Sequence, residues 1–196
     1  TWRTLPERQL SSGLSETIKH SCIASQPFFD YLNTNMDAIF GIDIDVCQNI
    51  ARENCRIKYQ VVTKDEKESG LREILNLGHT VGRAIETVSD YSLLHGEALS
   101  IGLVAEIKLA KKLGYCTDAD ELMMTSILKK AKLPVNIPEY IDREKLVKKL
   151  YTDKKVKNGK LRFVLQDGIG NIKSFENDQY ALEISESQIR EILIDM

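Results

Sequence analysis

The stretch LREILNLGHTVG, residues 71–82, holds His79 between two glycines, and a second histidine, His95, lies in LHGEA, residues 94–98. Each histidine is followed by an apolar, helix-forming run, so we expect each imidazole at or near the start of a helix. Neutral imidazole is a common metal ligand. If the loop between the two motifs folds back, both rings can bind one cation, and Glu16 is the best candidate for a third ligand.

Two glycines interrupt the helical pattern of residues 71–88. Gly78 and Gly82 each cost about 1 kcal/mol relative to alanine if they lie within a helix. A sequence tolerates that cost when something must approach the backbone closely. We therefore expect a close approach at this helix.

The remainder of the chain is mostly helical in pattern. Apolar residues recur at helical spacing, which predicts helices over residues 7–25, 27–40, 44–62, 97–113, 118–132 and 142–151. In the helix over 97–113 the apolar residues Leu99, Leu103, Ile107 and Ala110 share one face. Beyond these helices, the spacing of the apolar residues changes from that of a helix to that of a strand.

The late part of the chain predicts a small β-hairpin, formed by LRFVL at 161–165 and IKSF at 172–175. Ser185 and Gln188 form a capping box that predicts a last helix over 188–194. The expected fold class is therefore mostly α, a helical bundle with a late hairpin, and we expect residues 1–196 to form a single domain.

Composition excludes several classes of protein. A hydrophobic content of 42% and a charged content of 29% are typical of a globular protein. The net charge of -2 gives no reason to expect nucleic-acid binding, and no apolar run approaches the length of about 18 residues that a membrane span needs. Cys22, Cys47, Cys55 and Cys116 form no Cys-x-x-Cys pair, so we interpret them as reduced packing residues of a cytoplasmic protein.

The chain opens TWRTLP, without a methionine or a signal-peptide pattern. We interpret it as a segment of a longer protein. It also contains no Gly-x-Gly-x-x-Gly motif and no P-loop. The phosphates of any nucleotide cofactor must therefore be bound outside this chain.

A polar stripe precedes and includes the first histidine. Arg72, Asn76 and His79 are spaced by four and three residues, which places them on one face of a helix. Arginine binds carboxylate or phosphate through two parallel hydrogen bonds, so this face suits an anionic ligand. The alternative is an exposed polar face, but Gly78 and Gly82 argue against it, since a solvated face does not need glycine.

Glu16 and Lys19 are three residues apart and project from the same face of the first helix. The simplest interpretation from spacing alone is a solvated ion pair. His20 points elsewhere, and we expect it to be a surface residue. Glu97 is favourable near the positive end of the helix that His95 opens, and such a capped start is a rigid place for a ligand.

Glu16, His79 and His95 together supply one carboxylate oxygen and two imidazole nitrogens. Three protein ligands with an open fourth position are typical of catalytic rather than structural zinc. Such an ion polarises a substrate oxygen as a Lewis acid. Glu16 lies far from both histidines in the sequence, so no local motif supports its assignment.

These motifs resemble those of the 3-dehydroquinate synthase family. TLP at 4–6 and SGLSETIK at 12–19 resemble the start of that family's C-terminal helical domain, and DKK at 153–155 resembles its late segment. The resemblance spans nearly the whole chain in the same order. It implies the C-terminal domain of the dehydroquinate synthase-like and iron-containing alcohol dehydrogenase-like architecture, with the N-terminal NAD-binding α/β domain absent from this chain.

The resemblance also implies an activity. The family converts 3-deoxy-D-arabino-heptulosonate 7-phosphate to 3-dehydroquinate and phosphate, a lyase reaction in the shikimate pathway to chorismate and the aromatic amino acids. It uses a divalent metal, Zn²⁺ or Co²⁺, and NAD. The expected partners are the sugar-phosphate substrate, the N-terminal NAD-binding domain and a second subunit of a homodimer. We expect the isolated domain to be inactive.

The resemblance assigns roles residue by residue. Its metal ligands correspond to Glu16, His79 and His95. Its substrate-binding residues correspond to Lys19, Lys58, Arg72, Asn76 and Lys154. Its catalytic positions correspond to Lys19, to Glu68, whose role the resemblance does not define, and to Arg83.

Arg83 departs from the family pattern, which reads Gly-His-Thr-x-Gly-His where this chain has GHTVGR at 78–83. Arg83 lies one turn beyond His79 on the same face and can bind phosphate as a permanent cation. It cannot transfer a proton near pH 7, because its pKa is above about 12. Arg83 therefore leaves two possibilities for the substrate. It is that of the synthase or that of a related sugar-phosphate cyclase.

Three alternatives remain at this point. The first is a related sugar-phosphate cyclase. The second is a metal-dependent polyol or alcohol dehydrogenase, but these lack the anion-binding set of Lys19, Arg72 and Asn76. The third is a non-catalytic helical module, which predicts no metal binding.

Overall fold

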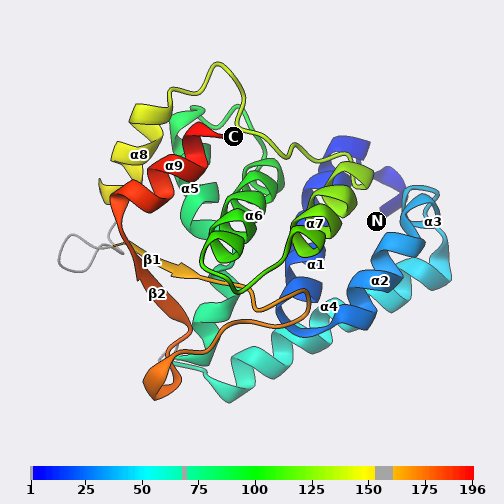
Figure 1. Ribbon diagram of the computed structural model, residues 1–196. Helices are drawn as coiled ribbons and strands as arrows, with labels where there is room; N and C mark the ends of the chain where they lie inside the picture. The colour runs from blue at the N-terminus through cyan, green and yellow to red at the C-terminus, as the bar shows by residue number, and fades with distance from the viewer. Residues whose placement is uncertain (1, 68–69, 153–160) are drawn as a thin grey trace.

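The computed structural model describes residues 2–67, 70–152 and 161–196 (Figure 1). It is a helical bundle with a small two-stranded sheet near the C-terminus, as predicted. The α-helices are α1 (Glu7–Ala24), α2 (Gln26–Thr34), α3 (Met36–Phe40), α4 (Ile44–Lys64), α5 (His79–Val88), α6 (His95–Lys112), α7 (Asp118–Lys130), α8 (Arg143–Thr152) and α9 (Glu186–Ile194). The 3₁₀ turns are η1 (Trp2–Thr4), η2 (Leu71–Asn76) and η3 (Glu176–Asp178), and the strands are β1 (Leu161–Val164) and β2 (Ala181–Ile184).

Helix α6 lies at the centre of the bundle and contacts α1, α5, α7 and α9 (Figure 1). Leu99 and Leu103 are buried as predicted, but Ile101 and Val104 on other faces are buried as well. The predicted apolar face is buried, and so are the other faces of α6, as expected of a central helix that is apolar nearly all round. Each fully buried leucine or isoleucine contributes about 1.5–3 kcal/mol.

Glycines allow α5 and α6 to approach until their backbones touch. A Cβ atom on Gly102 would lie 2.0 Å from the carbonyl oxygen of Gly78, and one on Gly82 would lie 3.2 Å from Cα of Leu99. The predicted close approach at Gly78 and Gly82 is thus confirmed. The group that approaches is helix α6.

Residues 71–88 do not form one helix, contrary to the prediction. The 3₁₀ turn η2 ends at Asn76, and α5 begins at His79. Between them Gly78 adopts φ +77°, a left-handed conformation that glycine reaches at little cost. Its N–H donates to Oε2 of Glu106, a fully buried carboxylate of α6, at 2.6 Å. The break therefore depends on a partner far along the chain.

The segment 27–40 also divides, into α2 and α3. Asn35 ends α2, where its backbone N–H and its side-chain amide both donate to the carbonyl oxygen of Tyr31. Asparagine is common at helix ends because its short amide satisfies backbone groups there. A second helix then begins at Met36.

The late sheet pairs different segments from those predicted. Strand β1 is antiparallel to β2, with Leu161 opposite Ile184, so residues 172–175 are not its main partner. Residues 172–175 instead follow the segment just after β1, through the Gln166–Ile172 bridge and the hydrogen bond from Lys173 N to Leu165 O.

The capping box at the start of the last helix is confirmed. Ser185 Oγ accepts from the N–H of Gln188, and the side chain of Gln188 accepts from the N–H of Ser185. Helix α9 begins at Glu186, two residues before the predicted start.

The four cysteines are free thiols. Cys22, Cys47 and Cys116 are buried, whereas Cys55 is exposed on α4. Within the described ranges, no helix is both long and apolar enough to cross a lipid bilayer.

We predict that Gly102→Ala lowers the free energy of unfolding by at least about 1–3 kcal/mol, because the added methyl group overpacks the α5–α6 contact. Gly13→Ala is the matched control, since a Cβ on Gly13 meets no atom within 4 Å and its helix position is exposed. It should raise stability by up to about 1 kcal/mol. Urea denaturation followed by circular dichroism measures both, and equal effects of the two substitutions would contradict the packing argument.

Candidate metal centre

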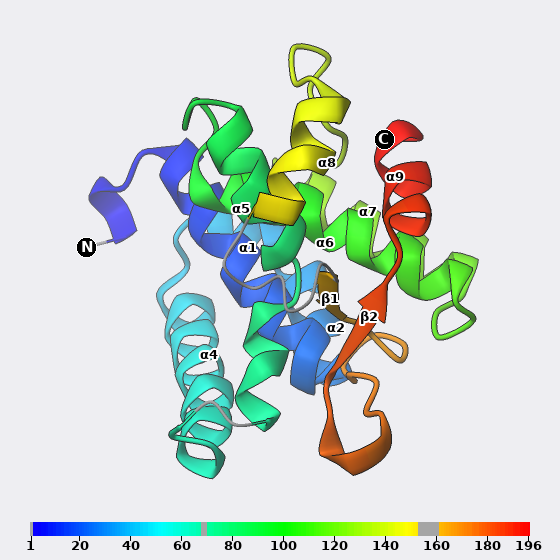
Figure 2. The same ribbon diagram turned by 90° about the vertical axis from the view of Figure 1, so that its left-hand side faces the viewer.

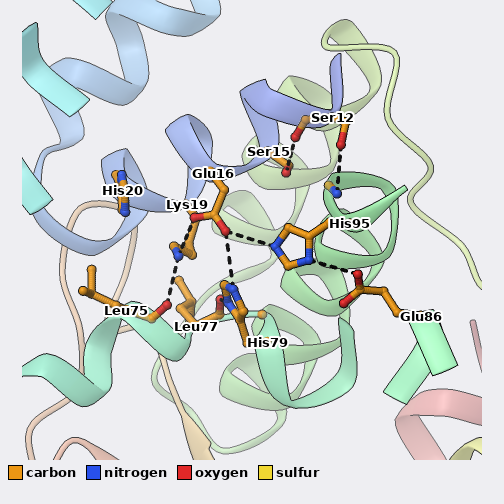
Figure 3. A network of polar contacts seen from close by, with 12 residues as sticks. Ser12, Ser15, Glu16, Lys19, His20, Leu75, Leu77, His79, Glu86 and His95 are labelled. Carbon is orange, nitrogen blue, oxygen red and sulfur yellow. Dashed lines mark hydrogen bonds and ion pairs between the residues drawn. The ribbon is translucent and has the colours of Figure 1, made fainter. Parts of the chain in front are cut away.

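Three elements bring Glu16, His79 and His95 together (Figure 3). Glu16 lies in the middle of α1, whereas His79 and His95 are the first residues of α5 and α6. Oε1 of Glu16 is 3.4 Å from Nε2 of His79 and 3.2 Å from Nε2 of His95. One potential ligand atom from each residue lies within 4.8 Å of the others.

The second nitrogen of each imidazole has an acceptor that orients the ring. Nδ1 of His79 lies 3.1 Å from the carbonyl oxygen of Leu77, and Nδ1 of His95 lies 3.2 Å from Oε1 of Glu86 (Figure 3). A carbonyl and a carboxylate accept hydrogen bonds, so each Nδ1 carries a proton, and Nε2, the nitrogen that faces Glu16, is the potential ligand atom of each ring. Histidines that bind metal usually have this kind of outer partner. The donor set therefore fits a divalent ion.

The electrostatics of the group centre on Glu16. Burial acts to raise the pKa of Glu16, but hydrogen bonds with His79 and His95 and the charge of Lys19 outweigh it and hold the pKa well below its ordinary value. The hydrogen bond with Glu16 in turn raises the pKa of His95, with burial opposing it. A metal ion competes with protons for such nitrogens, so its affinity falls as the pH falls.

The start of α6 is held against α1. The N–H of Gly96 donates to Oγ of Ser12 at 3.0 Å, and a Cβ on Gly96 would lie 1.9 Å from the carbonyl oxygen of Ser12. Glu97 caps the helix by accepting from the N–H of Leu94, and it pairs with Arg8 of α1 at 2.7 Å. Only glycine at position 96 allows the contact that brings His95 close to α1.

A polar cavity of about 490 Å³ opens beside this group, between α1, α4, η2 and α5. Figure 2 shows α4 extending from the bundle, and α4 contacts η2, which also contributes lining residues to the cavity. The residues that line the cavity are mostly polar, and several of them are basic: Glu16, Lys19, His20, Asn54, Lys58, Arg72, Leu75, Asn76, His79 and Arg83.

The predicted polar stripe is therefore brought to one cavity wall, although not by one continuous helix. Arg72 and Asn76 lie in η2, and His79 opens α5 after the turn at Gly78. Asp65 fixes the start of η2, since its Oδ2 accepts from the N–H of Arg72 at 2.9 Å.

Lys19 and Glu16 form an ion pair, but it is not solvated. Nζ of Lys19 lies 2.6 Å from Oε2 of Glu16 and donates to the carbonyl oxygen of Leu75 at 2.9 Å. Lys19 is 3% exposed. Burial lowers its pKa, and the charge of Glu16 partly offsets that effect. The interpretation as a solvated pair was therefore wrong.

His20 is also buried, contrary to the expected surface position. It is 4% exposed, and its Nδ1 lies 2.5 Å from Oδ1 of Asn54 on α4. Burial, reinforced by the charge of Lys19, lowers its pKa to about 4. The prediction failed because α4 packs against α1 at His20, a contact between segments far apart in the sequence that no local pattern indicates.

Two predicted site residues, Glu68 and Lys154, lie outside the described residues. Lys58 and Arg83 are exposed at the cavity. Arg83 also lines a second, smaller cavity together with Lys149 and Arg162.

Three residues that hold parts of the site in place were missed in the sequence. They are Ser12, Asn54 and Glu86. Glu86 follows His79 by seven residues, about two helical turns, so helical spacing alone could have placed the two on one face. The contacts of Ser12 and Asn54 cross between helices, and no local signal indicates them.

A family model described as 3-dehydroquinate synthase C-terminal matches residues 13–156. The chain belongs to the 3-dehydroquinate synthase family. Family members named 3-dehydroquinate synthase include one from Ruminiclostridium cellulolyticum, 43% identical over 100% of this chain and 53% of its own length. Another, from Thermodesulfovibrio yellowstonii, is 44% identical over 98% of this chain and 52% of its own length. The chain thus spans about half the length of these synthases.

Solved structures of two related enzymes share the fold. A 2-epi-5-epi-valiolone synthase from Streptomyces hygroscopicus subsp. jinggangensis 5008, with NAD⁺ and Zn²⁺ bound, matches 99% of this chain and 52% of its own at a TM-score of 0.84 and 23% identity. A 2-deoxy-scyllo-inosose synthase complexed with carbaglucose-6-phosphate, NAD⁺ and Co²⁺ matches 98% of this chain and 52% of its own at a TM-score of 0.86 and 22% identity.

We predict that Glu86→Gln weakens zinc binding about 10- to 100-fold, because the amide no longer holds the ring of His95 through a charged hydrogen bond. Chelator competition on the full-length protein measures the affinity. Glu139→Gln makes the same change of charge at an exposed loop position and should leave the affinity unchanged. Equal zinc affinity in the Glu86 variant and the wild type would contradict the assignment.

We also predict that the ring of His20 stays neutral until the pH falls to about 4. Because its folded pKa lies below the unfolded value, the unfolded chain takes up this proton first. The contribution to stability is therefore lost as the pH falls from about 6.5 toward 4. An NMR titration of the ring protons, with His20→Gln to assign the signal, measures the pKa, and a midpoint near 6.5 would refute the prediction.

Proposed function

We propose that this chain is the metal- and substrate-binding part of a 3-dehydroquinate synthase. The full enzyme would convert 3-deoxy-D-arabino-heptulosonate 7-phosphate to 3-dehydroquinate and phosphate. One observation carries the proposal: the Glu16, His79 and His95 group lies at the edge of a cavity lined with Lys19, Lys58, Arg72 and Arg83.

The charge of the cavity matches the proposed substrate, which carries a carboxylate and a phosphate. Lys58 and Arg72 are basic side chains at the cavity, and the amide of Asn76 adds a neutral partner. The guanidinium of Arg72 can bind one anionic group through two parallel hydrogen bonds. Because these cations are already in position, the site needs little reorganisation when negative charge develops on the reacting substrate.

Glu16, His79 and His95 would hold a divalent ion, Zn²⁺ or Co²⁺. When bound, it supplies Lewis-acid polarisation of a substrate oxygen. Lys19 has three N–H donors, and two of them are directed to Glu16 and Leu75. The third N–H is available to a ligand in the cavity. Lys19 can therefore bind substrate and hold Glu16 in place at the same time.

Arg83 would act where phosphate leaves. It lies at both cavities, and Lys149 and Arg162 line the second one with it. A permanent cation stabilises the negative charge of a departing phosphate without transferring a proton. Glu68 and Lys154, which lie outside the described residues, complete the proposed set of catalytic and substrate-binding residues.

The remaining partners belong to the full-length protein. The curated synthases are about twice as long as this chain. We infer that the other half binds NAD, and that the enzyme is a homodimer. The isolated 196-residue chain should then be inactive.

A related sugar-phosphate cyclase is the second candidate. Arg83 in place of the family's histidine favours it, and so does the common fold with two cyclases of other specificity. A polyol dehydrogenase is disfavoured, because its uncharged substrate has no use for four cations at one cavity.

We predict that the full-length enzyme, supplied with NAD, Zn²⁺ and 3-deoxy-D-arabino-heptulosonate 7-phosphate, releases inorganic phosphate. His95→Ala should reduce the rate by at least about 100-fold, because the ion loses one of three ligands. A colorimetric phosphate assay measures the release, and metal analysis of the purified proteins shows whether the variant has lost zinc.

Arg56→Ala is the control for surface charge on α4, since Arg56 pairs with Glu53 and does not line the cavity. It should retain the wild-type rate. No phosphate release by the wild type would exclude this substrate and favour the sibling cyclase. Equal zinc content in wild type and His95→Ala would refute the metal site.

A further inference from the structure

His20 lines the cavity but has no part in the proposed chemistry above. It is the only imidazole among the described lining residues besides the candidate ligand His79. Figure 3 shows it on the far side of Lys19 from His95, so the part of the cavity that it lines lies away from His95. An imidazole in such a place offers a function that lysine and arginine lack.

The hydrogen bond to Asn54 decides which nitrogen is free. Oδ1 of Asn54 is an acceptor, so Nδ1 of His20 must donate to it across 2.5 Å. Within the described part of the chain, Nε2 has no hydrogen-bond partner. A neutral ring with a proton on Nδ1 carries its lone pair on Nε2.

The surrounding charge keeps that lone pair available. His20 is 4% exposed, and the charges of Lys19 and Lys58 both act against a further positive charge on the ring. Its pKa of about 4 agrees with a neutral ring near pH 7. The neighbouring ammonium and guanidinium groups only donate hydrogen bonds, and Glu16 is already paired with Lys19 and lies against both candidate ligand histidines.

We propose that Nε2 of His20, fixed by Asn54, accepts a hydrogen bond from a hydroxyl group of the bound ligand. It would then be a specificity residue for polyhydroxylated anions. The cations of the cavity bind any small anion, whereas this acceptor favours an anion that also carries a correctly placed hydroxyl. The inference rests on the proposed function and names one further contact within it.

A purely structural role is the competing explanation, because the His20–Asn54 hydrogen bond also joins α1 to α4. The two explanations differ for ligands without a hydroxyl group. If the pair only maintains the cavity, its loss weakens every ligand. If Nε2 contacts the ligand, its loss weakens only ligands that donate a hydrogen bond there.

The test uses the full-length protein loaded with Zn²⁺ and NAD, with calorimetric binding of two probes. 3-Dehydroquinate carries ring hydroxyls and a carboxylate, whereas sulfate is an anion without a hydroxyl. His20→Leu should weaken 3-dehydroquinate binding about tenfold, the loss of one good hydrogen bond, and change sulfate binding less than about twofold. His20→Gln, whose amide oxygen has a reach similar to that of Nε2, should recover most of the affinity.

Parallel loss of both probes in His20→Leu, or unchanged binding of both, would overturn the inference. Failure of His20→Gln to recover any affinity for 3-dehydroquinate would also count against it. A different pattern marks failure of the proposed function: the wild type would then bind sulfate but not 3-dehydroquinate and would release no phosphate. That result removes the basis of the inference as well.

Discussion

Helix α6 touches the backbones of both α1 and α5, and the candidate metal group depends on these two contacts. At Gly96 the start of α6 meets the carbonyl oxygen of Ser12, which sets His95 beside Glu16. At Gly102 the next turns of α6 meet Gly78, the residue before His79. Ligand bonds to zinc are only about 2.0–2.2 Å long for nitrogen and oxygen, so a shift of one helix by the width of a methyl group would separate the ligands too far. The glycines are thus a requirement of the site as much as of the fold.

The surroundings of Glu16 differ in exposure, which divides the site into two parts. Toward α1 the carboxylate is paired with the buried Lys19, and toward α5 and α6 it meets two oriented imidazoles. Side-chain exposure rises from 11% at His79 to 47% at His95. Low exposure strengthens each electrostatic interaction because less water screens it. The buried side therefore favours fixed geometry, and the exposed side allows a ligand to enter.

Local signals predicted most of the helices and the positions of both histidines at helix starts. Periodicity, helix-capping residues and glycine stops are encoded within a few residues, so the α9 capping box and the close approach at Gly82 could be predicted. The break before His79 could not, because its buried partner, Glu106, lies on another helix. The pairing of β1 with residues 181–184 and the burial of His20 beneath α4 also depend on contacts between distant segments. The two glycine-flanked histidine motifs suggested the candidate ligands, the resemblance to a family named the same three residues, and the coordinates bring them together.

The distribution of thiols has a practical consequence for spectroscopy. Cys55 is exposed and follows Asn54 directly on α4, whereas the other three cysteines of the chain are buried, and burial raises the pKa of Cys22 to about 12. Only a thiolate reacts quickly with maleimides and similar reagents, and a buried thiol with a raised pKa forms little of it. Within this chain a dye would therefore attach at one position of the native fold, without engineered cysteines. Its emission would report on movements of α4 when the neighbouring cavity fills.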